Sequence, residues 1–150
     1  MSLKVVIDQE IKQAMLAKEK EKLAVLRAIK AAILLEQTKE GGDGKLSQEQ
    51  GIQILQKLHK QRIEAAKIYT SQNREDLALI EESQADIIEH FLPKQLGKEE
   101  VESILSQIIQ ETGASGPSDM GKVMGRAMGK LKGKAPGDLI SSIVKELLNK

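Results

Sequence analysis

Residues 120–135 are Met-Gly-Lys-Val-Met-Gly-Arg-Ala-Met-Gly-Lys-Leu-Lys-Gly-Lys-Ala, a stretch that repeats every four residues. On an α-helix each residue turns by about 100°, so a step of four residues drifts by only about 40°. The apolar residues of the repeat therefore gather on one side, at the i, i+3, i+4, i+7 spacing of a core-facing helix. They are Met120, Val123, Met124, Ala127, Met128 and Leu131. The stretch predicts a helix that packs on an aliphatic core.

The opposite arc of this helix combines glycine with positive charge. Its residues are Gly121, Lys122, Gly125, Arg126, Gly129 and Lys130. A glycine inside a helix costs roughly 0.8–1.0 kcal/mol relative to alanine, so three of them forgo about 2–3 kcal/mol. This cost indicates that something approaches the bare backbone beside a row of cations. Two interpretations stay open, namely the phosphates of a nucleic acid and a helix that crosses in close contact.

Under the first interpretation, cations contact phosphates while the glycines let the backbone come close, since cations and backbone amides are the usual phosphate contacts. We define the basic arc as Lys122, Arg126, Lys130, Lys132 and Lys134. The second interpretation is structural. Lysines in the last turn complement the helix dipole, a charged arc is usually a solvated face, and the glycines admit a neighbouring helix.

The segments beside this helix also carry helix signals. Ser118 can cap its start, and Gly133 stands where a left-handed residue would end it. Pro136 can take the first turn of a final helix. Apolar residues repeat at helical spacing in that final helix and in an earlier one: Leu139, Ile140, Ile143, Val144, Leu147 and Leu148, and before them Val101, Ile104, Leu105, Ile108 and Ile109.

The first 92 residues show further helical patterns. Two apolar stripes open the chain: Leu3, Ile7, Ile11 and Met15, then Leu23, Leu26, Ile29 and Ile33. Ser47 and Gln50 form a capping-box signature that opens a third helix after the glycine-rich loop 41–44. Asn73 is the predicted N-cap of a fourth helix, which Pro93 ends.

The sequence as a whole predicts an all-α protein. We expect an N-terminal helical subdomain of about four helices in residues 1–92 and a small three-helix subdomain in residues 93–150. The chain has one Phe, one Tyr, no Trp and no Cys. Its core must therefore be aliphatic, and disulfides and thiolate metal sites are excluded. The scarcity of aromatic residues also argues against stacking platforms for single-stranded bases.

Charge is distributed unevenly along the chain. Residues 113–150 hold seven Lys/Arg against three Asp/Glu, whereas residues 1–112 hold sixteen against nineteen. A basic end suggests an anionic partner there, although this excess is far below that of a strong nucleic-acid binder. The N-terminus lacks the pattern of a signal peptide, and no apolar run reaches membrane-spanning length. We expect a cytoplasmic protein without a membrane partner.

No catalytic constellation is evident. His59 and His90 are the two histidines, and neither has a partner at metal-ligand spacing, so both are interpreted as structural. Gly44-Lys45 is followed by Leu46, where a phosphate loop requires Ser or Thr. We therefore predict no catalytic residue, no metal and no cofactor, and the interpretation leans against an enzyme.

Several segments resemble the YqeY family and the related tail domain of GatB, a subunit of the tRNA-dependent amidotransferase that converts misacylated Glu-tRNA or Asp-tRNA. The resemblance covers essentially the whole chain and is that of a stand-alone YqeY-like protein. The matching segments are residues 20–30, with Leu23, Leu26, Arg27 and Lys30, then 74–77, 92–96, 119–125, 132–135 and the closing apolar helix. One departure is Pro136-Gly137, where the family often has Asp-Gly, or Asn followed by Pro.

The resemblance implies an all-helical fold and a role in translation. Where the domain is appended to GatB or to some glutaminyl-tRNA synthetases, it helps to hold tRNA near its outer corner. By position, the basic arc would face the tRNA, together with Gly121, Gly125 and Gly129. The implied function is that of a non-catalytic tRNA-binding accessory protein, with a synthetase or an amidotransferase as a second candidate partner.

Two alternatives stand beside this expectation. The chain could be a protein-interaction module that docks on a synthetase or amidotransferase through the glycine stripe formed by Gly121, Gly125 and Gly129. It could also be a component of a carbon–nitrogen ligase with glutamine as amido-N-donor. That activity would belong to the larger complex, because the active site of GatB lies in a different domain to which nothing here corresponds.

Overall fold

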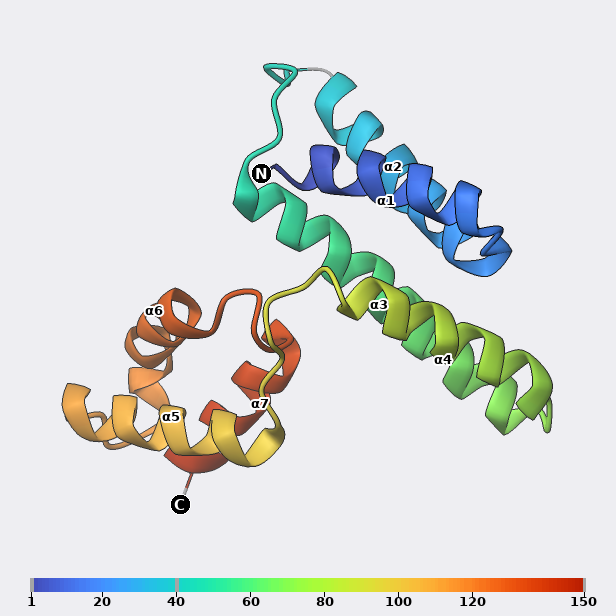
Figure 1. Cartoon of the computed structure of the whole chain (residues 1–150). Helices are drawn as coiled ribbons and strands as arrows, with labels where there is room; N and C mark the ends of the chain where they lie inside the picture. The colour runs from blue at the N-terminus through green and yellow to red at the C-terminus, as the bar shows by residue number, and fades with distance from the viewer. Residues whose placement is uncertain (1, 40, 150) are drawn as a thin grey trace. The chain divides into compact units, whose positions relative to one another are not determined.

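In the computed structural model of the chain, which describes residues 2–39 and 41–149, all regular structure is helical (Figure 1). Within these ranges there are seven α-helices, one short 3-10 helix and no strand. The α-helices are α1 Leu3–Ala17, α2 Lys20–Thr38, α3 Gln48–Ser71, α4 Glu75–Glu89, α5 Lys98–Thr112, α6 Met120–Leu131 and α7 Gly137–Leu148. The prediction of an all-α protein is confirmed.

The internal contacts divide the chain into two compact units, Met1–Leu92 and Pro93–Lys150. Met1 and Lys150, the outer limits of the two predicted subdomains, lie outside the described residues. Whether each unit folds as an independent subdomain stays a prediction. The two units are described separately below.

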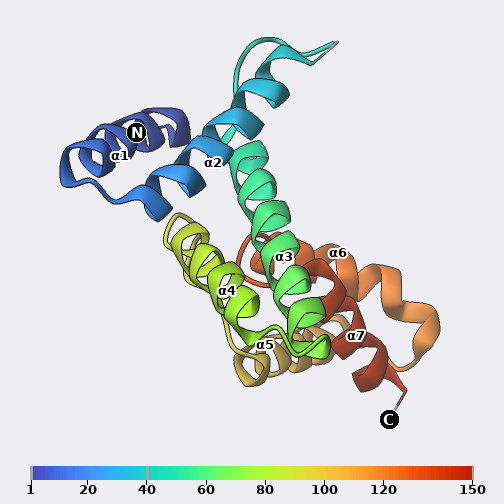
Figure 2. The ribbon, with the colours of Figure 1, turned by 90° about the vertical axis from the view of Figure 1, so that its right-hand side faces the viewer.

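In the first unit, α1 and α2 lie side by side, and α3 and α4 form an antiparallel hairpin (Figures 1 and 2). Its core draws on all four helices. The buried residues of this cluster are Ile7, Ala14, Val25, Leu26, Ile29, Ile33, Leu55 and Ile88. Nearer the hairpin turn, α3 and α4 bury the small side chains Ala66, Ala78 and Ala85, which allow the two helices to approach closely.

The capping box at the start of α3 is confirmed. The hydroxyl of Ser47 accepts a hydrogen bond from the N–H of Gln50 at 3.0 Å, and the Gln50 amide oxygen accepts one from the N–H of Ser47 at 2.9 Å. These reciprocal bonds satisfy two donors that the first turn of a helix leaves without partners. The box therefore fixes where α3 begins.

The prediction that Asn73 caps α4 is wrong. Asn73 lies in the left-handed region with φ +60°, and Arg74 occupies the N-cap position without a side-chain capping bond. The N–H of Arg74 instead donates to the carbonyl of Tyr69 at 2.8 Å. Asn73 serves the tight turn between the two helices, a conformation that asparagine tolerates better than most residues.

In the second unit, α5, α6 and α7 enclose one aliphatic core. Its buried residues are Val101, Leu105, Ile108, Val123, Ala127, Leu131, Ala135, Ile140, Ile143, Val144 and Leu148. Met120, Met124 and Met128 of α6 are partly buried against the same core. The predicted apolar side of α6 is therefore confirmed, and the arc that carries the glycines faces away from this core.

The end of α6 agrees with the prediction, but its start does not. Gly133 has φ +79° and follows the C-cap Lys132, as expected of a left-handed terminating residue. Ser118, the predicted cap, lies within the 3-10 helix Pro117–Asp119, and Asp119 takes the N-cap position. Asp119 also does not cap with its side chain, because its carboxylate accepts a hydrogen bond from the N–H of Ser115 at 2.9 Å.

The prediction that Pro136 lies in the first turn of α7 is wrong by one residue. Pro136 is the N-cap, with φ −63° and ψ 140°, and Gly137 begins the helix. An extended proline just before the helix has no N–H to leave unpaired. In the part of the chain that the structure describes, no helix combines the length and the apolar composition that a membrane span requires.

Candidate nucleic-acid interface

The glycine stripe of α6 is open. Gly121, Gly125 and Gly129 are all exposed, and a methyl group added at any of them would meet nothing within 4 Å. No helix of the second unit, as far as the structure describes it, therefore packs against the stripe. Close packing against another helix of the second unit is therefore excluded, whereas contact with a phosphate and contact with a helix of a partner both stay open as interpretations.

The five cations of the basic arc are all exposed, but their surroundings differ. The ammonium of Lys122 donates to the carbonyl of Thr112 at 3.1 Å, in the last turn of α5. A guanidinium nitrogen of Arg126 lies 4.0 Å from a carboxylate oxygen of Glu111. Among the described residues, the side chains of Lys130 and Lys134 have no carboxylate partner.

The spacing of the cations suits a polymer of negative charges. No acidic residue occurs between Met120 and Gly137. Because an α-helix rises 1.5 Å per residue, cations four residues apart follow each other at steps of about 6 Å along the axis. The row at Lys122, Arg126 and Lys130 therefore repeats along the helix with exposed backbone beside it, which is an arrangement able to contact successive phosphates.

The part of the basic arc beyond α6 is held by the segment that precedes α5. The side-chain amide of Gln95 donates to the carbonyl of Gly133 at 2.7 Å and to that of Pro93 at 2.8 Å. The N–H of Leu96 donates to the carbonyl of Lys134 at 2.9 Å. These bonds fix the backbone of the turn that presents the last lysines of the arc.

Sequence reasoning did not find Gln95 as a positioning residue. Its bond to Gly133 spans 38 residues, and no periodicity or spacing links the two positions. The only sequence signal was that Gln95 belongs to the segment 92–96, which matches the family.

The two histidines both belong to the first unit. His59 lies in α3, with its Nε2 atom 3.7 Å from a carboxylate oxygen of Glu89. His90 is the C-cap of α4 and contacts the ring of Phe91 edge to face. Residues 2–39 and 41–149 contain no group of three or more His, Asp or Glu side chains placed to hold a metal ion.

One exposed pair in the first unit has shifted pKa values. A two-pronged contact joins the guanidinium of Arg74 to Asp76 at 3.1 Å. These hydrogen bonds lower the pKa of Asp76 below its usual 3.8 and raise the pKa of Arg74. The pair lies at the start of α4, where an acidic side chain also complements the helix dipole, so it has a local structural role.

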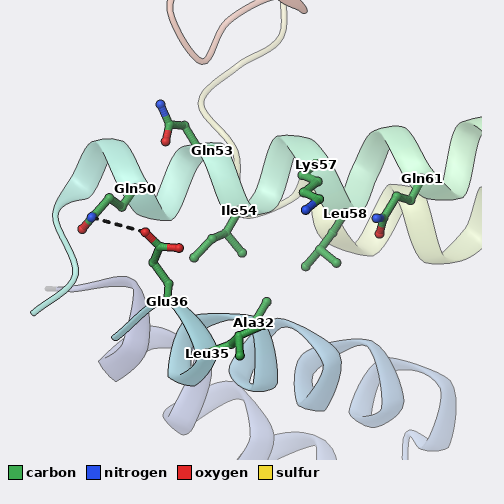
Figure 3. Close-up of a pocket in the computed structure, with 9 residues that line it drawn as sticks. All are labelled: Ala32, Leu35, Glu36, Gln50, Gln53, Ile54, Lys57, Leu58 and Gln61. Atoms are coloured by element: carbon green, nitrogen blue, oxygen red, sulfur yellow. Dashed lines mark hydrogen bonds between the residues drawn. The ribbon is translucent and has the colours of Figure 1, made fainter. Parts of the chain in front are cut away.

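A shallow groove of about 360 Å³ lies between α2 and α3 (Figure 3). Its lining consists of Ala32, Leu35, Glu36, Gln50, Gln53, Ile54, Lys57, Leu58 and Gln61. The apolar side chains Ile54 and Leu58 point toward α2, and the amide of Gln50 donates to Glu36 at 3.4 Å (Figure 3). The lining contains no histidine and no hydroxyl side chain.

Comparison with known proteins agrees with the sequence resemblance. The family model of the Yqey-like protein matches residues 4–148. The chain is also similar to the altered inheritance of mitochondria protein 41, mitochondrial, of Meyerozyma guilliermondii, with 36% identity over 87 residues. That match covers 57% of this chain and 44% of the relative, so the chain spans less than half of that protein. Because the family match extends over nearly its whole length, the chain belongs to the YqeY-like protein family.

Proposed function

We propose that this chain is a non-catalytic accessory protein that binds structured tRNA through phosphates and shape. The observation that carries the proposal is the outward face of α6. It combines three uncovered glycines with exposed cations and no intervening acid. A stability argument alone does not account for this composition, since each glycine inside the helix is unfavourable.

The chemistry of this face suits a folded RNA. Cations and backbone N–H groups contact phosphates, and such contacts position a protein without selecting a base sequence. Double-stranded RNA is recognised mostly by shape and by contacts to phosphates and 2′-hydroxyls. With one Phe, one Tyr and no Trp in the chain, stacking on unpaired bases has little to contribute.

Family membership supports the same proposal. The chain is a YqeY-like protein, and residues 119–125, residues 132–135 and the closing apolar helix resemble the tail domain of GatB. The name of the similar protein of Meyerozyma guilliermondii refers to mitochondria. A cytoplasmic location for this chain is part of the proposal.

Filter binding of total tRNA as a function of salt tests the proposal. The triple variant Lys122→Ala/Arg126→Ala/Lys130→Ala should bind more weakly and with a shallower salt dependence. Each neutralised phosphate contributes about 0.7–0.9 to the slope of log K against log salt. The matched control is Lys94→Ala/Lys98→Ala/Lys145→Ala, which removes three exposed lysines of the same unit. Equal affinity and slope for the wild type and the first variant would contradict the proposal.

A second candidate function is docking on a protein partner, favoured by the open space beside the three glycines. A helix that fits against the bare backbone should be lost in Gly125→Ala through steric clash, whereas phosphate contact should mostly survive. Pull-down from a lysate with and without nuclease separates the two. Capture that requires intact nucleic acid supports tRNA binding, and nuclease-resistant capture that Gly125→Ala abolishes supports the helix partner.

A third possibility is a catalytic role in transamidation. Adding the protein to a glutaminase assay with charged Glu-tRNA tests it directly. We expect no activity from the chain itself, and turnover of glutamine by the purified chain would refute its description as non-catalytic.

A further inference from the structure

An acidic residue in the last turn of α5 lies beside the row of cations on α6. A carboxylate oxygen of Glu111, Oε2, lies 4.0 Å from a guanidinium nitrogen of Arg126. The other oxygen, Oε1, accepts a hydrogen bond from the side-chain amide of Gln107 at 3.3 Å. This bond leaves Oε2 facing the arginine, so Glu111 holds an anionic oxygen near a group that the proposed function assigns to a phosphate.

We propose that Glu111 competes with phosphate for Arg126 and so limits the affinity of the basic arc for polyanions. The inference rests on the proposed function and identifies a residue that regulates the same site. A carboxylate and a phosphate offer the same kind of partner to a guanidinium group, namely anionic oxygens. Binding of a phosphate at Arg126 must therefore displace Glu111 or place it beside a like charge.

The position of Glu111 is unfavourable for its own helix. A negative side chain near a helix C-terminus opposes the macrodipole, which favours cations there. The neighbouring carbonyl of Thr112 shows the favourable arrangement, because it accepts a hydrogen bond from the ammonium of Lys122. The dipole of α5 therefore does not favour a carboxylate at this position, whereas competition for Arg126 would give it a function.

The contact is weak enough to be reversible. The side chains of Arg126 and Glu111 are 59% and 43% exposed, and exposed ion pairs contribute little because water and salt screen them. A phosphate can therefore replace the carboxylate without unfolding any element. Loss of the competing charge should raise affinity about 1.4- to five-fold at low salt, the range expected for an exposed pair, and the gain should fade as salt increases.

The test is salt-dependent binding of total tRNA to the full-length chain and its Glu111→Gln variant. Glutamine keeps the size of the side chain and its acceptor for Gln107, and it removes a charge that opposes the helix dipole, so the variant should fold. Glu100→Gln is the matched control. It makes the same change in net charge on the same helix, eleven residues away, or about 16 Å along the axis, which is beyond the screening length of about 10 Å at 0.1 M salt.

Two further variants, Arg126→Ala alone and Arg126→Ala combined with Glu111→Gln, isolate the role of Arg126. The proposal expects tighter binding for Glu111→Gln, no comparable gain for Glu100→Gln, and no gain from Glu111→Gln when Arg126→Ala is already present. An equal gain in both glutamine variants, or a gain that persists with Arg126→Ala, would show a general charge effect and overturn the inference. Wild-type binding with no gain from Glu111→Gln overturns the inference alone. Absence of wild-type binding overturns the proposed function and the inference together.

Discussion

Helices α6 and α7 have the same length and share one core, yet their outward faces differ in charge and in glycine content. Each has twelve residues, and each buries aliphatic side chains in the same cluster. On α7 the outward residues include Asp138, Lys145 and Glu146, which have mixed signs. On α6 the outward face has cations only, alternating with glycine.

The comparison of α6 with α7 shows which of their features folding requires. Packing needs the apolar side of both helices, and both supply it. A solvated outer face needs only good helix formers with mixed charge, as α7 has. The glycines of α6 forgo about 2–3 kcal/mol of helix propensity and have no neighbour within 4 Å that would require their small size. Packing within the second unit therefore does not explain their presence, and the proposed function does.

The largest expected effects concern the side that the two helices have in common. Leu131→Ala in α6 and Ile143→Ala in α7 each remove a large side chain that is at most 2% exposed. Each should lower the free energy of unfolding by about 2–5 kcal/mol, as measured by urea denaturation. A loss below about 1 kcal/mol in one helix alone would show that the two do not share an equivalent core.

The next effect concerns the glycines and has the opposite sign. Gly121→Ala/Gly125→Ala/Gly129→Ala should raise the free energy of unfolding by about 2–3 kcal/mol, because alanine favours the helix and the added methyl groups meet open space. Gly113→Ala is the control and should destabilise, since Gly113 has φ +71°. Destabilisation by the triple variant would mean that other parts of the protein cover the glycine stripe. The glycines of α6 would then have a packing role, and the outward face of α6 would no longer differ from that of α7 in the way described.

A smaller effect is expected at the turn that joins the two helices. Gln95→Ala removes the amide that donates to the carbonyls of Gly133 and Pro93. It should lower the free energy of unfolding by about 0.5–1.5 kcal/mol per lost bond and should reduce the salt dependence of tRNA binding without removing a charge. Unchanged binding alongside lost stability would show that the turn does not contribute to the interface.

The smallest effect compares single lysines on the two helices. Lys130→Ala should reduce the slope of log K against log salt for tRNA by about 0.7–0.9, the contribution of one phosphate. Lys145→Ala in α7 makes the same charge change and should leave the slope unaltered. Equal reductions for both variants would indicate diffuse attraction by net charge rather than contact with α6.

Local signals in the sequence were sufficient for much of the fold. The apolar spacing of α6, the Ser47–Gln50 capping box and the left-handed Gly133 all depend on residues within one or two turns, and all are confirmed. Asn73 and Ser118 failed for a common reason. Both residue types suit turns as well as helix caps, and the backbone around each takes a turn or a 3-10 helix before the α-helix begins.

The candidate site could be predicted only in part. The outward direction of the cations follows from the helical period, but their partners do not. Thr112 lies ten residues before Lys122 in sequence. Glu111 lies in α5 and Gln95 in the segment before it, and the placement of both relative to α6 depends on how the core packs. The contacts of Lys122 and Arg126 with the end of α5 therefore depend on the tertiary structure.

Selective ¹⁵N labelling of the twelve glycines followed by NMR titration with total tRNA shows whether RNA contacts the outward face of α6, because it observes the bare backbone itself. We expect the amide signals of Gly121, Gly125 and Gly129 to shift or broaden at low salt and to recover as salt increases. The glycines of the first unit, Gly41, Gly42, Gly44 and Gly51, should remain unchanged. Perturbation confined to that second group, or none at any glycine while tRNA is bound, would contradict this expectation.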